Sequence, residues 1–236
     1  MRVPAGWTSF ARPAPSSNSP ARPEKGRSVM GMDLQDLVDP AHTALCVVEC
    51  QNGVVGEASN MPAVADAVAA SGLLPRLAVL AGAARSAGVR VVHCTFHAHP
   101  DLWGGNRNSR LFAAGRRAEV QQYVGTEAVE PAAEIGFVEG VDVIVPRFHG
   151  LSPVAGTGLA PMLGNEGVTT VVVVGVSLNV AIPNAVFDLV NEGFQVVVPA
   201  DGSVATMPGY GEQVLEHTLA YISTLTDVAT LVEAWL

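Results

Sequence analysis

Five short runs of mostly apolar, often β-branched residues recur along the chain, and segments of helix length separate them. Polar residues do not alternate with apolar ones inside the runs, so each predicted strand is apolar on both faces. Strands of that kind occur where helices cover both sides of a sheet. The runs are residues 43–49, 89–96, 141–147, 169–176 and 194–199.

Residues between the runs have the spacing of amphipathic helices. The segment 73–87 repeats leucine and alanine every three or four residues and stops at Gly88. The segment 182–192 has Val186, Leu189 and Val190 at helical spacing and stops at Gly193. Residues 212–222 and 228–235 are predicted as closing helices. Alternating strands and helices indicate βαβ units. We therefore expect a three-layer, doubly wound α/β fold with a mostly parallel sheet of about six strands, the first strand being central.

The first 31 residues differ from the rest in composition. They are rich in Pro, Ser, Ala and Arg and have no apolar periodicity, which predicts a disordered tail. A transit peptide and a start codon assigned too early, with Met30 or Met32 as the true start, are both compatible with this tail. Residues 32–236 contain no composition break or internal repeat, so we expect them to form one domain.

Charge and cysteine content exclude several classes of protein. The net charge of −9 argues against a nucleic-acid partner. No stretch reaches the roughly 18 uninterrupted apolar residues of a membrane helix. The three cysteines show no pairing pattern, which indicates a reducing compartment. We expect a cytoplasmic protein that forms a homo-oligomer and has neither a nucleic-acid nor a membrane partner.

Polar residues stand at the ends of the apolar runs, where open α/β sheets bind their ligands. Glu49 ends the first run, and a partly desolvated carboxylate there suits proton transfer. Arg147 ends the run 141–147; a purely structural salt bridge with Glu49 is the alternative. We predict Glu49 and Arg147 as catalytic residues. Substrate-binding candidates at the strand ends are Gln51, Asn52, His93, His149, Ser177 and Asn179.

An aromatic, Gly/Asn-rich segment at residues 102–112 is typical of a loop that lines a pocket. Trp103 and Phe96 are predicted to form an apolar wall for the substrate. A surface loop packed by its own aromatic side chain explains the same segment equally well.

The segments TALCVVECQNGVVG, VRVVHCTFHAHP and VIVPRFHGLSPVAGTGL, with the later GVSLNV, resemble the isochorismatase-like hydrolase superfamily over residues 43–205. The family's amidases use an Asp–Lys–Cys triad. The matching positions here are Glu49, Arg147 and Ala181, and Lys25, in the tail, is the only lysine in the chain. The resemblance thus implies a small-molecule hydrolase that lacks the family's thiol nucleophile, with Ala181 lining the substrate site.

The family's isochorismatase branch offers a mechanism that needs no nucleophile on the protein. The resemblance implies that Glu49 protonates an enol ether, water captures the resulting cation, and Arg147 holds a substrate carboxylate. Two alternatives stay open: a non-catalytic ligand-binding relative, and a hydrolase that uses a displaced cysteine such as Cys50 or Cys94.

Some amidases of this family bind a metal after the second strand. The matching positions here are His97 and His99, but the family's third ligand has no clear counterpart. We therefore predict no metal and no other cofactor.

Overall fold

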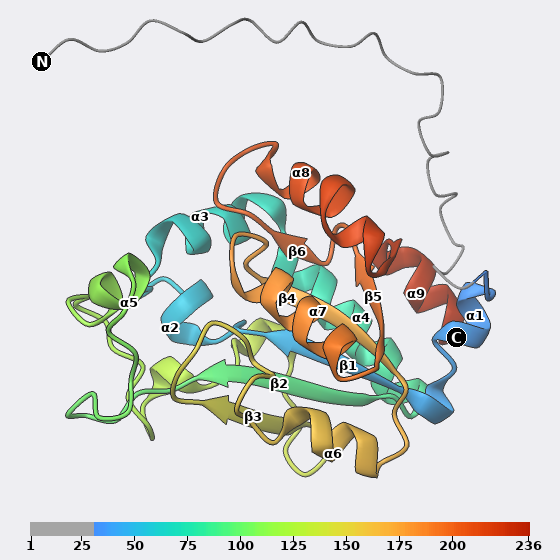
Figure 1. Cartoon of the computed structure of the whole chain (residues 1–236), viewed down its shortest axis with the longest axis horizontal. Helices are drawn as coiled ribbons and strands as arrows, with labels where there is room; N and C mark the ends of the chain where they lie inside the picture. Colours follow the sequence, from blue (N-terminus) through green and yellow to red (C-terminus); the bar gives the residue numbers. More distant parts are fainter. Residues whose placement is uncertain (1–30) are drawn as a thin grey trace, which may run out of the picture.

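A seven-stranded parallel sheet forms the centre of the computed structural model, which describes residues 31–236 (Figure 1). Its order is β3-β2-β1-β4-β5-β7, and β6 pairs with β4. The predicted doubly wound fold is confirmed, with β1 in the interior of the sheet. The strands are β1 (Thr43–Val48), β2 (Arg90–Phe96), β3 (Val143–Arg147), β4 (Thr170–Val176), β5 (Gln195–Pro199), β6 (Ser203–Val204) and β7 (Thr224–Thr226).

Two hydrophobic cores lie on opposite faces of this sheet. Along β1, Leu45 and Val47 point into one core, whereas Cys46 and Val48 point into the other. Every residue of β1 and β4 is buried. The continuous apolar runs in the sequence follow from this arrangement, because successive side chains of a strand alternate between faces and both faces are covered.

Helices from both halves of the chain cover the two faces. One core is covered by α1 (Leu34–Leu37), α2 (Asn52–Val55), α3 (Pro62–Ser71), α4 (Leu73–Ala87) and α9 (Val228–Ala234). The other is covered by α6 (Leu159–Asn165), α7 (Ala181–Asn191) and α8 (Tyr210–His217). Helix α5 (Arg110–Gly115) lies beyond the carboxyl ends of β2 and β3 (Figure 1). Within residues 31–236, four 3-10 helices span Pro40–His42, Glu127–Val129, Ala133–Ile135 and Leu219–Tyr221.

Helix α4 has the bounds that its sequence pattern predicts. Gly72 and Gly88, which flank it, adopt the left-handed conformation with φ of 63° and 87°. The predicted helix 212–222 is instead divided, because α8 ends at His217 and a 3-10 turn follows. The short strand β7 then forms where the sequence analysis expected a connection between two helices.

The predicted tail, residues 1–31, lies outside the described residues except for Gly31. Within residues 31–236, no single helix is both long enough and apolar enough to cross a bilayer.

Candidate functional site

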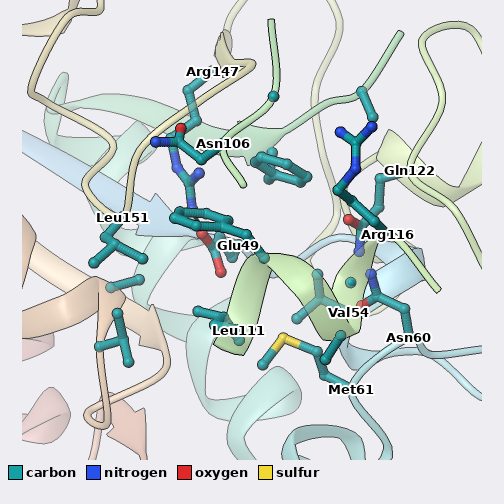
Figure 2. A pocket seen from close by; sticks show the side chains of 18 of the residues that line it. Glu49, Val54, Asn60, Met61, Asn106, Leu111, Arg116, Gln122, Arg147 and Leu151 are labelled. Atoms are coloured by element: carbon teal, nitrogen blue, oxygen red, sulfur yellow. Dashed lines mark hydrogen bonds and ion pairs between the residues drawn. The ribbon is translucent and has the colours of Figure 1, made fainter. Parts of the chain in front are cut away.

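A cavity of about 470 Å³ opens at the carboxyl end of the sheet, against the segment that carries α5 (Figure 2). Its wall is mostly apolar, with Phe96, Trp103, Phe112 and Phe148 as its large aromatic side chains. A cavity of this size, with few polar groups, is typical of a small-molecule site. The residues predicted from the sequence that line it are Glu49, Phe96, Trp103, Arg147, Ser177, Asn179 and Ala181.

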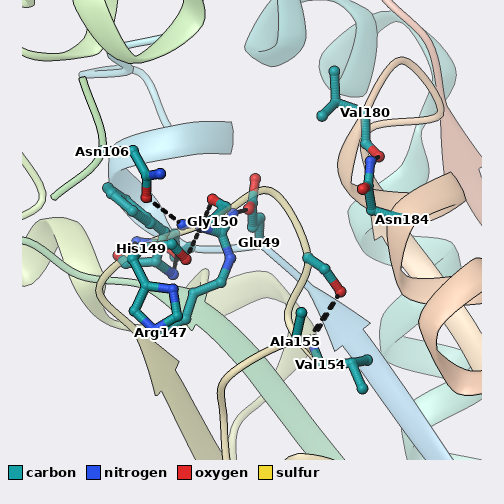
Figure 3. Close-up of polar contacts among 12 residues, drawn as sticks. Glu49, Asn106, Arg147, His149, Gly150, Val154, Ala155, Val180 and Asn184 are labelled. Atoms are coloured by element: carbon teal, nitrogen blue, oxygen red, sulfur yellow. Dashed lines mark hydrogen bonds and ion pairs between the residues drawn. The ribbon is translucent and has the colours of Figure 1, made fainter. Parts of the chain in front are cut away.

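Glu49 and Arg147 form a buried ion pair in this cavity (Figure 3). Glu49 directly follows β1 and has a φ of 52°, a left-handed conformation that costs a non-glycine residue about 1 kcal/mol or more. The backbone therefore leaves the extended conformation at the point where the Glu49 side chain enters the cavity. The pair places a carboxylate and a guanidinium where a ligand can reach them.

The guanidinium of Arg147 is held on three sides. Besides Glu49, it contacts the Gly150 carbonyl, to which Nη1 donates at 2.9 Å, and the ring of Phe96, whose centroid lies 4.8 Å away. The Gly150 N–H in turn donates to Oδ1 of Asn106 at 2.7 Å (Figure 3). These contacts connect the loop after β3 to the segment 102–112 and fix the orientation of the pair.

The first turn of α7 forms another part of the wall. Ala181 opens this helix and is buried, and its methyl group lines the cavity. Ser177 and Asn179 precede it; Asn179 accepts a hydrogen bond from Thr206 N–H at 3.0 Å. Position 181 therefore faces the same cavity as Glu49, but an alanine offers no nucleophile there.

No thiol lines this cavity in the part of the chain that the structure describes. Cys46, Cys50 and Cys94 are all buried in the two cores. Burial and the neighbouring Glu49 carboxylate raise the pKa of the Cys50 thiol far above its usual range. A hydrogen bond with Cys46, together with burial, raises the pKa of Cys94. Thiols of this kind stay protonated and are poor nucleophiles.

Four predicted substrate-binding residues, Gln51, Asn52, His93 and His149, do not line the cavity. Gln51 braces the strand end, because its amide exchanges hydrogen bonds with the backbone of Phe96 at 2.7 and 2.9 Å. Asn52 donates to the Glu127 carbonyl at 3.1 Å. His149 is exposed, with its ring packed beside Gly156.

His93 lies in β2, beside Ile144 at the start of β3. It is buried and contacts Oδ2 of Asp142 at 3.2 Å, while Arg85 makes two hydrogen bonds of 2.8 Å to the same carboxylate. Burial lowers the pKa of His93, although Asp142 opposes this shift. The position of His93 in the strand directs its ring into this polar cluster and away from the carboxyl edge.

The histidines after β2 do not fit a metal site. Nε2 of His97 contacts the Thr95 hydroxyl at 2.9 Å, and the ring of His99 stacks on Phe148 with centroids 4.8 Å apart. Across residues 31–236, no group of three or more His, Cys, Asp or Glu side chains is placed to hold a metal ion.

Much of the cavity wall comes from residues that the sequence analysis did not single out. Leu111 and Arg116 belong to the segment around α5, Asn60 and Met61 precede α3, and Phe148 and Leu151 follow β3. Phe148 lies between two predicted residues, Arg147 and His149, and its aromatic character was a usable signal. Leu111 belongs to the segment 102–112, which the sequence analysis predicts to line a pocket. The others stand in segments without periodicity, and nothing in their spacing indicates a shared cavity.

The isochorismatase domain family matches residues 43–230, which is most of the chain. The chain belongs to the isochorismatase family. Among curated proteins, the ureidoacrylate amidohydrolases RutB from two strains of Methylorubrum extorquens are each 27% identical over 241 residues, covering 96% of this chain and 92% of each relative.

Solved structures of the isochorismatase family share this fold. A cysteine hydrolase from Pseudomonas syringae pv. phaseolicola superposes with a TM-score of 0.72 at 22% identity, covering 84% of this chain and 94% of that one. N-carbamoylsarcosine amidase from Thermoplasma acidophilum gives a TM-score of 0.60 at 20% identity, covering 79% and 96%. At identities this low, the structural similarity establishes the common fold alone.

In this isochorismatase-family chain, Glu49, Arg147 and Ala181 come from the end of β1, the end of β3 and the start of α7, and all three line one cavity. They are the positions that the family resemblance assigns to an acid, a cation and a nucleophile. The fold thus brings all three positions to one site.

Proposed function

We propose that this member of the isochorismatase family hydrolyses a C–N bond of a small molecule by acid–base catalysis, with water as the nucleophile and Glu49 as the proton carrier. One observation carries the proposal: the Glu49–Arg147 pair lies in a mostly apolar cavity that no thiol lines within residues 31–236. The amidohydrolase names of the curated relatives support the same class of bond.

Glu49 can carry the proton through the whole reaction. The Glu49 carboxylate, held beside the Arg147 guanidinium, is placed to accept a proton from a water molecule. The water oxygen bonds to the carbonyl carbon, and Glu49 then donates that proton to the leaving nitrogen as the C–N bond breaks. The products are a carboxylic acid and an amine, and Glu49 is again a carboxylate.

Arg147 serves this scheme as a positioning residue. Its guanidinium already contacts Glu49, the Gly150 carbonyl and the Phe96 ring. These contacts hold the carboxylate in one orientation, which is the main requirement for proton transfer at a fixed point. They also leave Arg147 less available for the substrate carboxylate than the sequence analysis expects.

Cleavage of an enol ether is the second chemistry that the sequence analysis raises. It begins with a proton donated to carbon, so Glu49 would have to start in its acid form. In the structure Glu49 is paired with Arg147, and the curated relatives are amidohydrolases, whose name refers to C–N bond cleavage; C–N hydrolysis therefore has the stronger support. A displaced cysteine has the least support, because Cys50 and Cys94 are buried outside the cavity.

The proposal is tested by turnover of the purified protein on a panel of amides, ureido compounds, enol ethers and cyclic carboxylates. Glu49→Gln keeps the size of the side chain but removes the transferable proton, and we expect turnover to fall by about 10²–10⁴-fold. Glu57→Gln, an exposed residue outside the cavity, is the matched control and should keep wild-type turnover.

Wild-type turnover by Glu49→Gln would refute the proposed role of Glu49. Tight binding of a panel compound without any turnover would instead favour a non-catalytic ligand-binding protein. Turnover of enol ethers alone would move the proposal to the acid-first mechanism.

A further inference from the structure

The cavity carries one positive charge that no group in its wall balances. Its charged lining residues of fixed sign are Glu49, Arg116 and Arg147. Glu49 and Arg147 neutralise each other, whereas Arg116 has no carboxylate within ion-pair distance among residues 31–236. A cation in the wall of an apolar cavity raises the local concentration of anionic ligands, here against a chain whose net charge is −9.

Arg116 is held in place while most of its donors stay available. It directly follows α5, is half-buried, and donates from Nη1 to the Leu102 carbonyl at 3.1 Å. This bond ties the two ends of the segment 102–116 together and limits the motion of the guanidinium. A guanidinium has five N–H donors, so the remaining ones can form the two parallel bonds that a carboxylate accepts.

Asn60 supplies a second polar group for the same ligand end. Its Oδ1 atom is buried and has no hydrogen-bond partner within the described residues. Asn60 and Arg116 lie on the same side of the cavity in Figure 2, and Leu151 lies on the other. The Nδ2 group of the same amide carries two N–H donors, which can donate to an anion in the cavity.

The rest of the wall selects an apolar ligand body. Phe96, Phe112 and Phe148 line the space together with Met61 and Leu111. Aromatic and aliphatic side chains favour a ring or a hydrocarbon chain over a polyhydroxylated compound.

We propose that the substrate is a largely apolar monocarboxylate, such as an aryl-substituted acid, whose carboxylate binds Arg116 and Asn60 while its scissile bond lies at Glu49. The inference deepens the proposed hydrolase function and rests on it for the scissile bond. Arg116 is thereby a specificity-determining residue. Its charge directs the carboxylate end of the ligand to Arg116 and leaves the scissile bond at Glu49.

The test measures binding, by calorimetry, of 3-phenylpropanoate and its neutral isostere 3-phenylpropanamide to the full chain. We expect the carboxylate to bind about tenfold more tightly than the amide, as a charge-assisted pair contributes. Arg116→Gln should abolish this ratio and leave amide binding unchanged. Arg117→Gln, which changes the neighbouring residue outside the cavity, should keep it.

All measurements are repeated in the Glu49→Gln/Arg147→Met background, where no hydrolysis takes place under the proposed mechanism and where no unpaired Arg147 can bind the carboxylate. A carboxylate preference that persists in that background supports the role of Arg116 whether or not Glu49 is catalytic. A failure of this inference can therefore be told apart from a failure of the proposed hydrolase function. Equal affinities for the two compounds, no binding of either, or a preference that survives Arg116→Gln would each overturn the inference.

Discussion

The Asn106 side chain holds Gly150 in place by accepting its N–H at 2.7 Å, and the Gly150 carbonyl holds the Arg147 guanidinium at 2.9 Å. Asn106 thus acts on Glu49 through two intermediates, without being its direct partner. Two single hydrogen bonds therefore connect the segment 102–112, through the loop after β3, to the Arg147 guanidinium.

Removing the hydrogen bond between Asn106 and Gly150 should impair catalysis more than folding. We expect Asn106→Ala to lower kcat by about tenfold, because a misplaced Arg147 no longer fixes the Glu49 carboxylate. The loss of one part-buried hydrogen bond should cost only about 1 kcal/mol of stability. Asn165→Ala, at an exposed position at the end of α6, is the control for both readouts, kcat and thermal unfolding. An equal kcat for wild type and Asn106→Ala would show that Gly150 needs no such support.

The native protein should be inert to thiol reagents. Its three cysteines are buried, and the pKa values of Cys50 and Cys94 are raised, so a chromogenic disulfide should label none of them before unfolding. Ala181→Cys should gain one reactive thiol, since position 181 lines the cavity. It should not become an efficient amidase, because Glu49 is longer than aspartate and the cation beside it is an arginine. Inactivation of the wild type by the reagent, prevented by substrate, would restore the displaced-cysteine hypothesis.

The buried His93 should make stability depend on pH. Burial lowers its pKa in the folded state, so the unfolded chain binds the proton more readily. Its contribution is therefore complete above the unfolded pKa of about 6.5 and is lost as the pH falls below it, by at most about 1.4 kcal/mol per pH unit. Denaturant unfolding between about pH 7 and pH 5 should show this decline.

His93→Gln should flatten that decline, because the titrating ring is gone. His217→Gln, at a position outside both cores, should keep the wild-type slope.

Asp142 affects stability in a lower pH range than His93. Burial opposes the ionisation of Asp142, but the hydrogen bonds from Arg85 and from the Val138 N–H lower its pKa overall. Its contribution is lost only below about pH 4, where the carboxyl becomes protonated.

Sequence patterns located the parts of this site that continue a strand. Glu49 and Arg147 end apolar runs of the sequence, and parallel strands place those ends at one edge. Gln51 has the same appearance in the sequence, but the left-handed backbone at Glu49 breaks the alternation of side chains, and Gln51 turns toward the backbone of Phe96. Arg116 and Asn60 reach the cavity from segments without periodicity, and only the tertiary structure shows that they line the same cavity. The predicted cytoplasmic location and homo-oligomer stay predictions.

The Glu49–Arg147 pair should behave as a buried ion pair in a double-mutant cycle. Both side chains are largely buried, so Arg147→Met leaves an uncompensated carboxylate and should cost about 3–5 kcal/mol of unfolding free energy. Glu49→Gln combined with Arg147→Met removes both charges, and it should recover much of that loss. The more exposed pair of Arg76 and Asp201, 3.6 Å apart, is the control, with an expected coupling of about 0–1 kcal/mol. Additive effects of Glu49→Gln and Arg147→Met would mean that the two residues do not support each other, and the positioning role of Arg147 would then lose its basis.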